Sequence, residues 1–320
     1  DGINEIVDSN EYISENARKK ARIVGKNSIF ITCIGSIGKI GIASDGEYAF
    51  NQQINAIIPN DRVQPKYLAY NLLFNKPRFV AIANAPVVPI INKSQFGEFT
   101  VNIETDIDRQ CEIVDVLDKF TQIIQQRNKE ISALDELIKA RFVEMFGDPV
   151  MNEKGWITKS LLDMGRCKNG MNFHYDDEGV EINCLGVGDF KELSIIDNTD
   201  ELPTVSLKEM PSEEYLLKDD DIVFVRSNGN KALVGRSIAV YPGNVPTTFS
   251  GFCIRYRKHD NEIIVPYLLR ALKADSMRMK MTGRGANIQN LNQQILGTLV
   301  IPVPPIELQN QFADFVKQVD

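Results

Sequence analysis

Short runs of β-branched and aromatic residues, closed by loops that contain glycine, occur at corresponding places in both halves of the chain. Such runs predict strands, and segments with a proline in their first turn predict helices. Each half therefore predicts a mixed α/β domain. The predicted elements are strands at 29–34, 38–43 and 99–103 with a helix at 65–74 in the first half, and strands at 222–225, 235–240 and 298–302 with a helix at 266–274 in the second.

The two halves are copies of one unit. At an offset of 200, Tyr67 and Leu68 align with Tyr267 and Leu268, and Asn92 aligns with Asn292. The strand motifs align at a shift of 193 and the helices that follow the domains at a shift of 199. A repeat of this kind predicts two tandem copies of a domain followed by a helix.

A stretch without proline or glycine runs from Glu104 to Phe146 and ends at Gly147-Asp148-Pro149. Apolar residues recur in it at spacings of four and three, which predicts one long helix of about 60 Å with a coiled-coil seam. We expect this seam to pack against a helix of another copy or another subunit, because an apolar face in water is unfavourable. The seam residues are Ile113, Leu117, Phe120, Ile124, Ile131, Leu134 and Ile138.

The composition is that of a globular protein, with 320 residues of which 43% are hydrophobic and 25% charged. No apolar run approaches the roughly 18 residues that a membrane span needs. Since the first residues also lack a signal-peptide pattern, a cytoplasmic location is expected. The five cysteines are scattered and contain no C-x-x-C pair, so buried thiols are predicted rather than disulfides or a zinc knuckle.

The net charge of −7 argues against a surface that attracts nucleic acid everywhere, but the charge is unevenly distributed. Residues 171–221 contain 15 acidic residues and three lysines, whereas residues 226–284 contain 11 lysines and arginines and three acidic residues. One concentrated basic face could hold a polyanion in spite of the acidic total. Ordinary solvated surface charge is the alternative interpretation.

The search for catalytic motifs finds none. There is no phosphate-binding G-x-x-x-x-G-K-[ST] loop, and His174 and His259 lie outside any metal-ligand spacing. The G-x-x-G-x-x-G segment at 35–41 fits no dinucleotide fingerprint and predicts a tight hairpin. The run Asp219-Asp220-Asp221 could be imagined as metal ligands of a nuclease, but a solvated turn that leads into a strand is the favoured interpretation.

Several loops combine glycine with side chains that suit nucleic acid. Arginine, asparagine and glutamine can read base edges, while lysine, serine and backbone amides position phosphates. Polar loops are common, so this signal is weak by itself. The candidate DNA-binding residues are Ser36, Lys39, Asn51, Gln52 with its neighbour Gln53, Asn92 and Lys93 in the first half, and Arg226, Ser227, Asn228, Lys231, Arg236, Arg284, Asn287, Gln289 and Asn290 in the second.

Three groups of segments, in their order along the chain, resemble the specificity subunit of type I restriction-modification enzymes. They are residues 34–39 with 51–54, residues 141–149 before Gly155-Trp156, and residues 301–309. The Phe-Gly-Asp-Pro junction and the Pro-Pro-x-x-x-Gln helix start are the more specific motifs. The resemblance covers nearly the whole chain.

The resemblance implies two repeated target recognition domains joined by a long coiled-coil-type helix. The expected boundaries are 1–103 for the first domain, 104–147 for the central helix, 148–303 for the second domain and 304–320 for the start of a second long helix. Comparison of the two copies suggests that about 38 residues are missing from the start of the first, and the second long helix is expected to be incomplete.

In function, the resemblance implies a non-catalytic subunit that reads a split target in double-stranded DNA and directs modification and restriction subunits. S-adenosylmethionine, ATP and magnesium are expected in those partner subunits, and no cofactor or metal in this chain. A DNA-processing enzyme, either a nuclease or a methyltransferase with an unrecognised site, is the alternative. A coiled-coil protein without DNA binding is a third interpretation.

Overall fold

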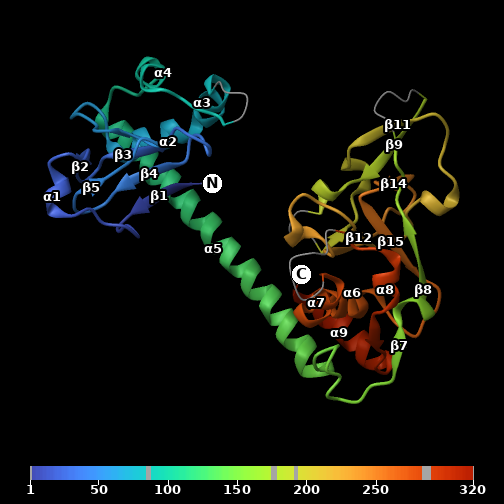
Figure 1. The fold of residues 1–320 in the computed structure, drawn as a ribbon. Helices are drawn as coiled ribbons and strands as arrows, with labels where there is room; N and C mark the ends of the chain where they lie inside the picture. Colours follow the sequence, from blue (N-terminus) through green and yellow to red (C-terminus); the bar gives the residue numbers. More distant parts are fainter. Residues whose placement is uncertain (1, 84–87, 174–178, 191–193, 283–289, 320) are drawn as a thin grey trace. The chain divides into compact units, whose positions relative to one another are not determined.

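The structure, a computed structural model, describes residues 2–83, 88–173, 179–190, 194–282 and 290–319 (Figure 1). The chain folds as two compact units, Asp1–Glu130 and Ile131–Asp320. The division falls within one long helix, α5 (Ile107–Phe146), which contributes residues to both. This 40-residue helix confirms the predicted central helix, whereas the predicted domain boundaries stay a prediction. No helix in the described ranges is both long and apolar enough to cross a membrane.

Unit 1 is built on a four-stranded sheet with the order β1-β4-β3-β6. Strand β1 (Ile3–Ile6) runs parallel to β4 (Ile40–Ala43), while β3 (Ile29–Thr32) is antiparallel to both of its neighbours, β4 and β6 (Ile54–Ile57). The apolar side chains of β3 and helix α2 form its main core. The remaining elements are the ribbon β2 (Ile23–Val24) and β5 (Tyr48–Ala49) and the helices α1 (Glu15–Arg18), α2 (Pro65–Phe74), α3 (Lys76–Ile82) and α4 (Lys93–Glu98).

Unit 2 repeats this sheet and enlarges it. The order is β10-β13-β12-β15-β8, and a second sheet has the order β11-β9-β14. The strands are β10 (Ile195–Ile196), β13 (Ser237–Val240), β12 (Asp221–Val225), β15 (Cys253–Lys258), β8 (Gly165–Asn169), β11 (Thr204–Leu207), β9 (Val180–Leu185) and β14 (Thr247–Phe249). The helices are α6 (Val265–Lys273), α7 (Asp275–Thr282), α8 (Gln293–Gly297) and α9 (Ile306–Val319), with short 3-10 turns between strands.

The strand registers confirm the internal repeat. Ile29 pairs with Ile57 in unit 1, as Ile222 pairs with Tyr256 in unit 2. At the other end of the same strands, Thr32 pairs with Ile54, as Val225 pairs with Cys253. Residues 29–32 therefore correspond to 222–225, and residues 54–57 correspond to 253–256.

A buried glutamine holds the start of the last helix in each unit. The side-chain carbonyl of Gln110 accepts a hydrogen bond from Gln64 N at 2.7 Å, and its amide donates to Glu104 O at 2.6 Å. Gln309 does the same in unit 2, accepting from Ile264 N at 3.0 Å and donating to Pro304 O at 2.8 Å. The predicted Pro-Pro-x-x-x-Gln helix start thus has a structural cause, because a buried amide needs these partners.

The predicted closing strand exists in unit 2 but not in unit 1. Residues 300–302 form β16 (Val300–Pro302), which pairs with β7 (Thr158–Ser160). Residues 99–103 form no strand, so this prediction is wrong for the first half. The physical reason is the partner, because β7 lies in a segment that has no counterpart among the described residues of unit 1.

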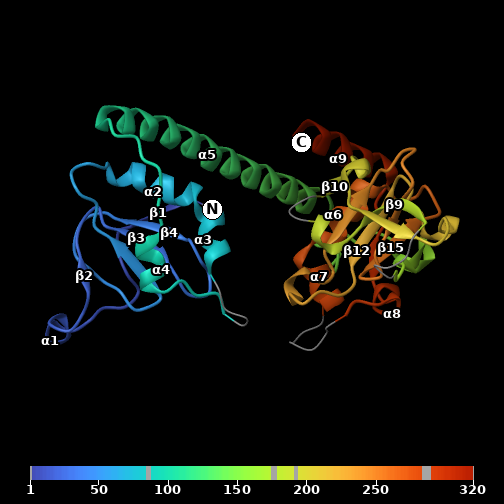
Figure 2. The same cartoon turned by 90° about the horizontal axis from the view of Figure 1, so that it is seen from above.

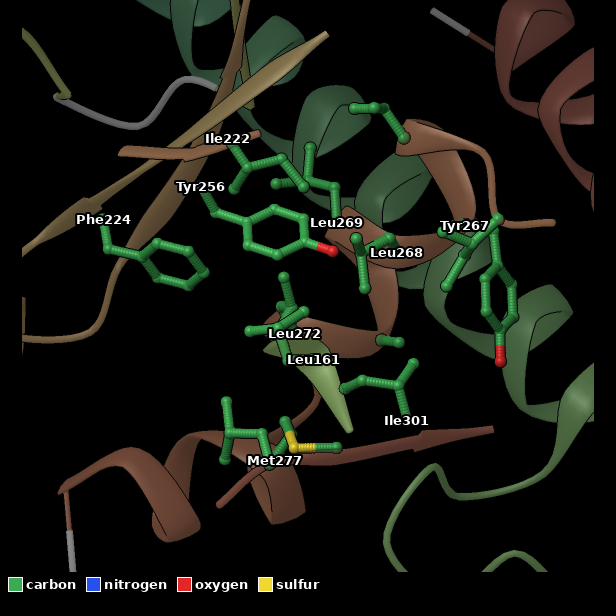
Figure 3. Close-up of a cluster of buried hydrophobic side chains, with 14 of the residues drawn as sticks. Leu161, Ile222, Phe224, Tyr256, Tyr267, Leu268, Leu269, Leu272, Met277 and Ile301 are labelled. Carbon is green, nitrogen blue, oxygen red and sulfur yellow. The ribbon is translucent and has the colours of Figure 1, made fainter. Parts of the chain in front are cut away.

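The core of unit 2 lies between its main sheet and α6 (Figure 3). Tyr256 of β15 packs there with Leu268 and Leu272 of α6. The end of α5 closes the same core, since the ring of Phe142 stacks on Tyr267 at 5.5 Å and that of Phe146 meets it edge-on at 4.8 Å.

The seam of α5 divides into three parts along the helix. The first part of the helix runs beside α2 (Figure 2). In unit 1, Ile113 and Leu117 are half-buried beside α2 and line a pocket of about 380 Å³. In unit 2, Ile138 is buried in the core. The seam residues between these ends are exposed, namely Phe120, Ile124, Ile131 and Leu134. Cys111, predicted as a buried thiol, is exposed on the same helix.

Candidate nucleic-acid interface

Three loops of unit 2 meet where strand β12 ends. The first loop (226–236) follows β12, and the second (250–252) precedes β15. The third contains Asn290 and Leu291, which contact the residues that follow β12. Arg226 N donates to Phe252 O at 2.8 Å, and Leu291 N donates to Arg226 O at 2.8 Å. Ser227 and Asn290 form an isolated β-bridge. The structure thus joins two of the predicted loops, although their residues lie about 60 positions apart.

Unit 1 contains the same loop junction at the end of β3. Cys33 N donates to Gln53 O at 2.8 Å, and Ile91 N donates to Cys33 O at 2.9 Å. Ile34 and Ile90 form the corresponding β-bridge. We call the meeting point of the three loops the loop junction in both units. The hydrogen bonds place Cys33 where unit 2 has Arg226, and Gln53 where unit 2 has Phe252.

Each first loop closes as a hairpin on a glycine followed by a basic residue. Gly38 and Gly235 have φ of 76° and 79°, a conformation that glycine adopts at no steric cost. Their N–H groups donate to Thr32 O and Val225 O, both at 2.9 Å. The predicted hairpin is confirmed, and Lys39 and Arg236 occupy the same position at its end.

Several candidate side chains stabilise the loops themselves. The side-chain carbonyl of Asn51 accepts from Gln53 N at 3.0 Å, and that of Asn228 accepts from Asn230 N at 2.7 Å. Asn92 is the N-cap of α4, where its Oδ1 accepts from Gln95 N at 2.9 Å. These structural roles were not predicted from the sequence. Contact of the same residues with DNA stays a prediction.

The other candidate DNA-binding residues differ in their exposure, and some of them lie outside the described residues. Arg226 is half-buried, and its Nη1 donates to Gly251 O at 3.2 Å, so the guanidinium is tied to the second loop. Ser36, Lys39, Gln52, Lys93 and Asn290 are exposed. Arg284, Asn287 and Gln289 lie outside the described residues, as does the side chain of Lys231.

Phe252 is a junction residue that the sequence search missed. It lies in the second loop, and its side chain is 62% exposed. The shift of 199 that aligns the later helices also places Asn51, Gln52 and Gln53 on Ser250, Gly251 and Phe252. That alignment could have identified it, but Phe252 is neither basic nor polar and therefore did not match the residue types sought.

Four of the eleven basic residues counted over 226–284 are held within the fold of unit 2. Arg255 is buried, Arg257 is ion-paired with Asp221, and Arg270 with Asp135. Arg278 donates to Ala232 O and thereby braces the first loop. These four charges act within the fold, so the basic surface is smaller than the count over 226–284 indicated.

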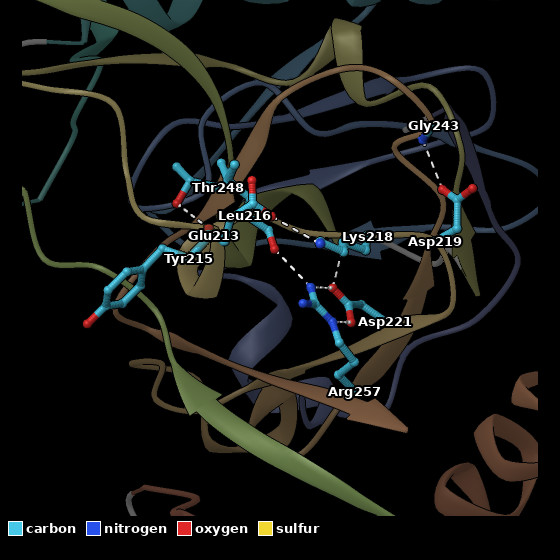
Figure 4. A network of polar contacts seen from close by, with 9 residues as sticks. All are labelled: Glu213, Tyr215, Leu216, Lys218, Asp219, Asp221, Gly243, Thr248 and Arg257. Carbon is cyan, nitrogen blue, oxygen red and sulfur yellow. Dashed lines mark hydrogen bonds and ion pairs between the residues drawn. The ribbon is translucent and has the colours of Figure 1, made fainter. Parts of the chain in front are cut away.

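The acidic run before β12 is only partly a solvated turn. Asp220 adopts φ of 68° and Asp219 accepts from Gly243 N at 2.9 Å, as suits a turn. Asp221, however, is fully buried and bonded to Arg257 (Figure 4). Its solvation was wrongly predicted, because the arginine lies on the neighbouring strand and is distant in sequence. Within the described ranges, no three His, Cys, Asp or Glu side chains are grouped to hold a metal ion.

Comparisons with known proteins agree with this architecture. The type I restriction enzyme StySPI specificity subunit of Salmonella potsdam is 23% identical over 337 residues, covering 96% of this chain and 71% of that protein. The MjaVIII specificity subunit of Methanocaldococcus jannaschii is 22% identical over 332 residues, covering 94% and 74%. The crystal structure of the type I restriction-modification system S subunit from M. genitalium shares the fold, with a TM-score of 0.53, 20% identity, and coverage of 100% of this chain and 81% of that one.

The family profile described as the type I restriction modification DNA specificity domain matches most of the chain in two segments. The matched residues are 3–133 and 153–320, one match for each half of the repeat. The chain therefore belongs to the type I restriction-modification DNA specificity family, and its function is the recognition of a DNA target.

Proposed function

We propose that each unit reads one half of a two-part sequence in double-stranded DNA. The observation that carries this proposal is the repetition of the loop junction, with the same three loops, the same hydrogen bonds and a basic residue after the same glycine. Two recognition units in one chain fit a target with two halves. The junctions differ in their side chains, so the two half-sites are expected to differ in sequence.

The residue types at the junction divide into two roles. Lys39 and Arg236 suit phosphate contacts, which set affinity and register without reading sequence. The exposed amide of Gln52 suits a base edge, since glutamine can bond adenine through two hydrogen bonds in the major groove. The side-chain carbonyls of Asn51 and Asn228 accept hydrogen bonds within their turns, so their amide N–H groups are the atoms expected to contact DNA.

The chemistry is proposed to reside in other subunits that this chain directs. Modification subunits would hold S-adenosylmethionine and methylate the target, and restriction subunits would use ATP and magnesium for cleavage, while this chain needs no cofactor. The exposed seam residues Phe120, Ile124, Ile131 and Leu134 support a helical partner, from another subunit or a second copy, because apolar faces of this size are normally covered.

Methylome sequencing of cells that carry the complete system tests the proposal. We expect one methylated motif with two defined parts separated by undefined bases. Replacing both Gln52 and Gln53 with alanine should alter only one part of the motif. Replacing both Asn228 and Asn290 with alanine should alter only the other part. A continuous motif, or changes in both parts from one unit, would contradict two independent half-sites. Methylation or cleavage of DNA by the purified chain alone would favour the enzyme alternative.

A further inference from the structure

Gln53 and Phe252 occupy one equivalent position in the two units. Each precedes the strand beside the central one, and each backbone carbonyl accepts from the first residue after that central strand, Cys33 N or Arg226 N, at 2.8 Å. Both side chains are exposed. The fold therefore presents a polar amide in unit 1 and a phenyl ring in unit 2 at the same point of the loop junction.

The backbone around Phe252 is held on both sides. Its carbonyl also accepts from Ser227 N at 3.3 Å, and its N–H donates to Ser250 Oγ at 3.3 Å. Gly251 N donates to Met171 O at 2.6 Å, which ties the loop to the segment that follows β8. An aromatic ring on a backbone fixed in this way can contact a ligand with little further loss of conformational entropy.

We propose that position 53/252 is a base-contacting position in both units and that Phe252 contacts the C5-methyl group of a thymine in the major groove. The inference rests on the proposed role of the units as DNA readers. Thymine presents the methyl group as its apolar feature in the major groove, and phenylalanine is a side chain that contacts it. Gln53 at the equivalent position matches adenine, so both half-sites are expected to hold an A·T pair there, read through the thymine methyl group in unit 2 and through the adenine edge in unit 1.

A uracil scan tests this contact. The complex of the full chain with its modification subunits is titrated with duplexes in which each thymine of the half-site is replaced in turn by uracil, which lacks only the methyl group. Wild-type protein should lose about 3- to 10-fold in affinity at one position, the size expected for one buried methyl group. Phe252→Ala should bind the thymine and uracil duplexes equally at that position, and Phe252→Leu should retain part of the preference.

Phe74→Ala serves as the matched control, because Phe74 is a strongly exposed phenylalanine on α2 and not in a loop junction. It should leave the thymine preference unchanged. Two results would overturn the inference: a uracil scan in which Phe252→Ala removes no preference, or an equal loss of affinity for every duplex, which would indicate a wedge between base steps. If wild-type complex bound no duplex specifically, the proposed function itself would fail.

Discussion

The guanidinium of Arg257 forms two parallel hydrogen bonds with the carboxylate of Asp221, Nε to Oδ1 and Nη2 to Oδ2, each of 2.7 Å (Figure 4). Asp221 begins β12 and Arg257 lies on the neighbouring β15. The same Nη2 donates to Leu216 O at 2.9 Å, which holds the preceding segment. This pair joins the two strands at the end of β12 opposite the loop junction.

Asp221→Asn should strongly destabilise unit 2. The substitution removes the charge that balances Arg257, and loss of one partner from a buried pair costs about 3 to 5 kcal/mol. Trp156, the single tryptophan, lies in unit 2 and reports its unfolding by fluorescence in urea. Glu213→Gln is the control, because its ion pair with Lys218 is exposed and should change the free energy of unfolding by less than about 1 kcal/mol. Equal small effects from both variants would contradict the role of the pair.

Gly170→Ala should disturb the second loop of unit 2. A Cβ at Gly170 would lie 2.5 Å from Phe249 O and closer still to Ser250 O, so the backbone of the loop must move. We expect a loss of about 1 to 3 kcal/mol in the free energy of unfolding, as for other overpacked sites. Gly229→Ala is the control, because a Cβ there meets nothing within 4 Å. Urea denaturation measures both, and equal stabilities would show that the loop adapts freely.

Charge reversal at the hairpin ends should weaken binding to every duplex. Lys39→Glu and Arg236→Glu each remove one expected phosphate contact. The negative slope of log affinity against log salt should therefore become shallower by about 0.9 for each substitution. Fluorescence anisotropy at several salt concentrations, with cognate and unrelated duplexes, gives these slopes. Lys317→Glu, at an exposed site on α9, should leave the slope unchanged. A loss confined to the cognate duplex would instead assign these residues to base reading.

The middle of the α5 seam should mediate association. Ile124 and Ile131 are 59% and 65% exposed, so replacing both with lysine should leave each unit folded while the helix loses its partner. Sedimentation should show a species heavier than 36.0 kDa for the wild type and a monomer for the variant. Ile138→Lys is the contrasting variant, because Ile138 is buried and its replacement should destabilise unit 2. If the wild-type chain sedimented as a monomer both alone and after mixing with modification subunits, the proposed role of the seam in association would be wrong.

Cysteine alkylation should single out one thiol. Burial raises the pKa of Cys167 and Cys184 to about 12, and it also raises the pKa of Cys33 and Cys253. These thiols stay protonated near pH 8, and the thiolate is the reactive form. Mass spectrometry of native protein after brief iodoacetamide treatment should therefore find one adduct, at Cys111. Rapid modification of a second cysteine would show that a core opens on this timescale.

Much of the architecture follows from local chemistry that a sequence displays directly. The spacing of apolar residues by four and three predicts α5 without tertiary information, because residues at that spacing lie on one face of a helix. Gly38 and Gly235 likewise mark hairpins, since a positive φ is a local requirement. The internal repeat was visible for the same reason: both units satisfy the same local rules in the same order.

Only the tertiary structure determines which residues that are distant in sequence lie next to each other. The loop junction joins segments such as 226–227 and 290–291 through backbone hydrogen bonds, and these carry no sequence signature. Asp221 is buried, and Arg257 and Arg270 are ion-paired, because oppositely charged partners approach from a neighbouring strand or a distant helix. The repeat aligns Phe252 with Gln53, but its hydrogen bond to Arg226 follows only from the register of β12 and β15. Hydrophobic pattern determines which elements form, whereas contacts between distant elements determine which side chains are left to meet DNA.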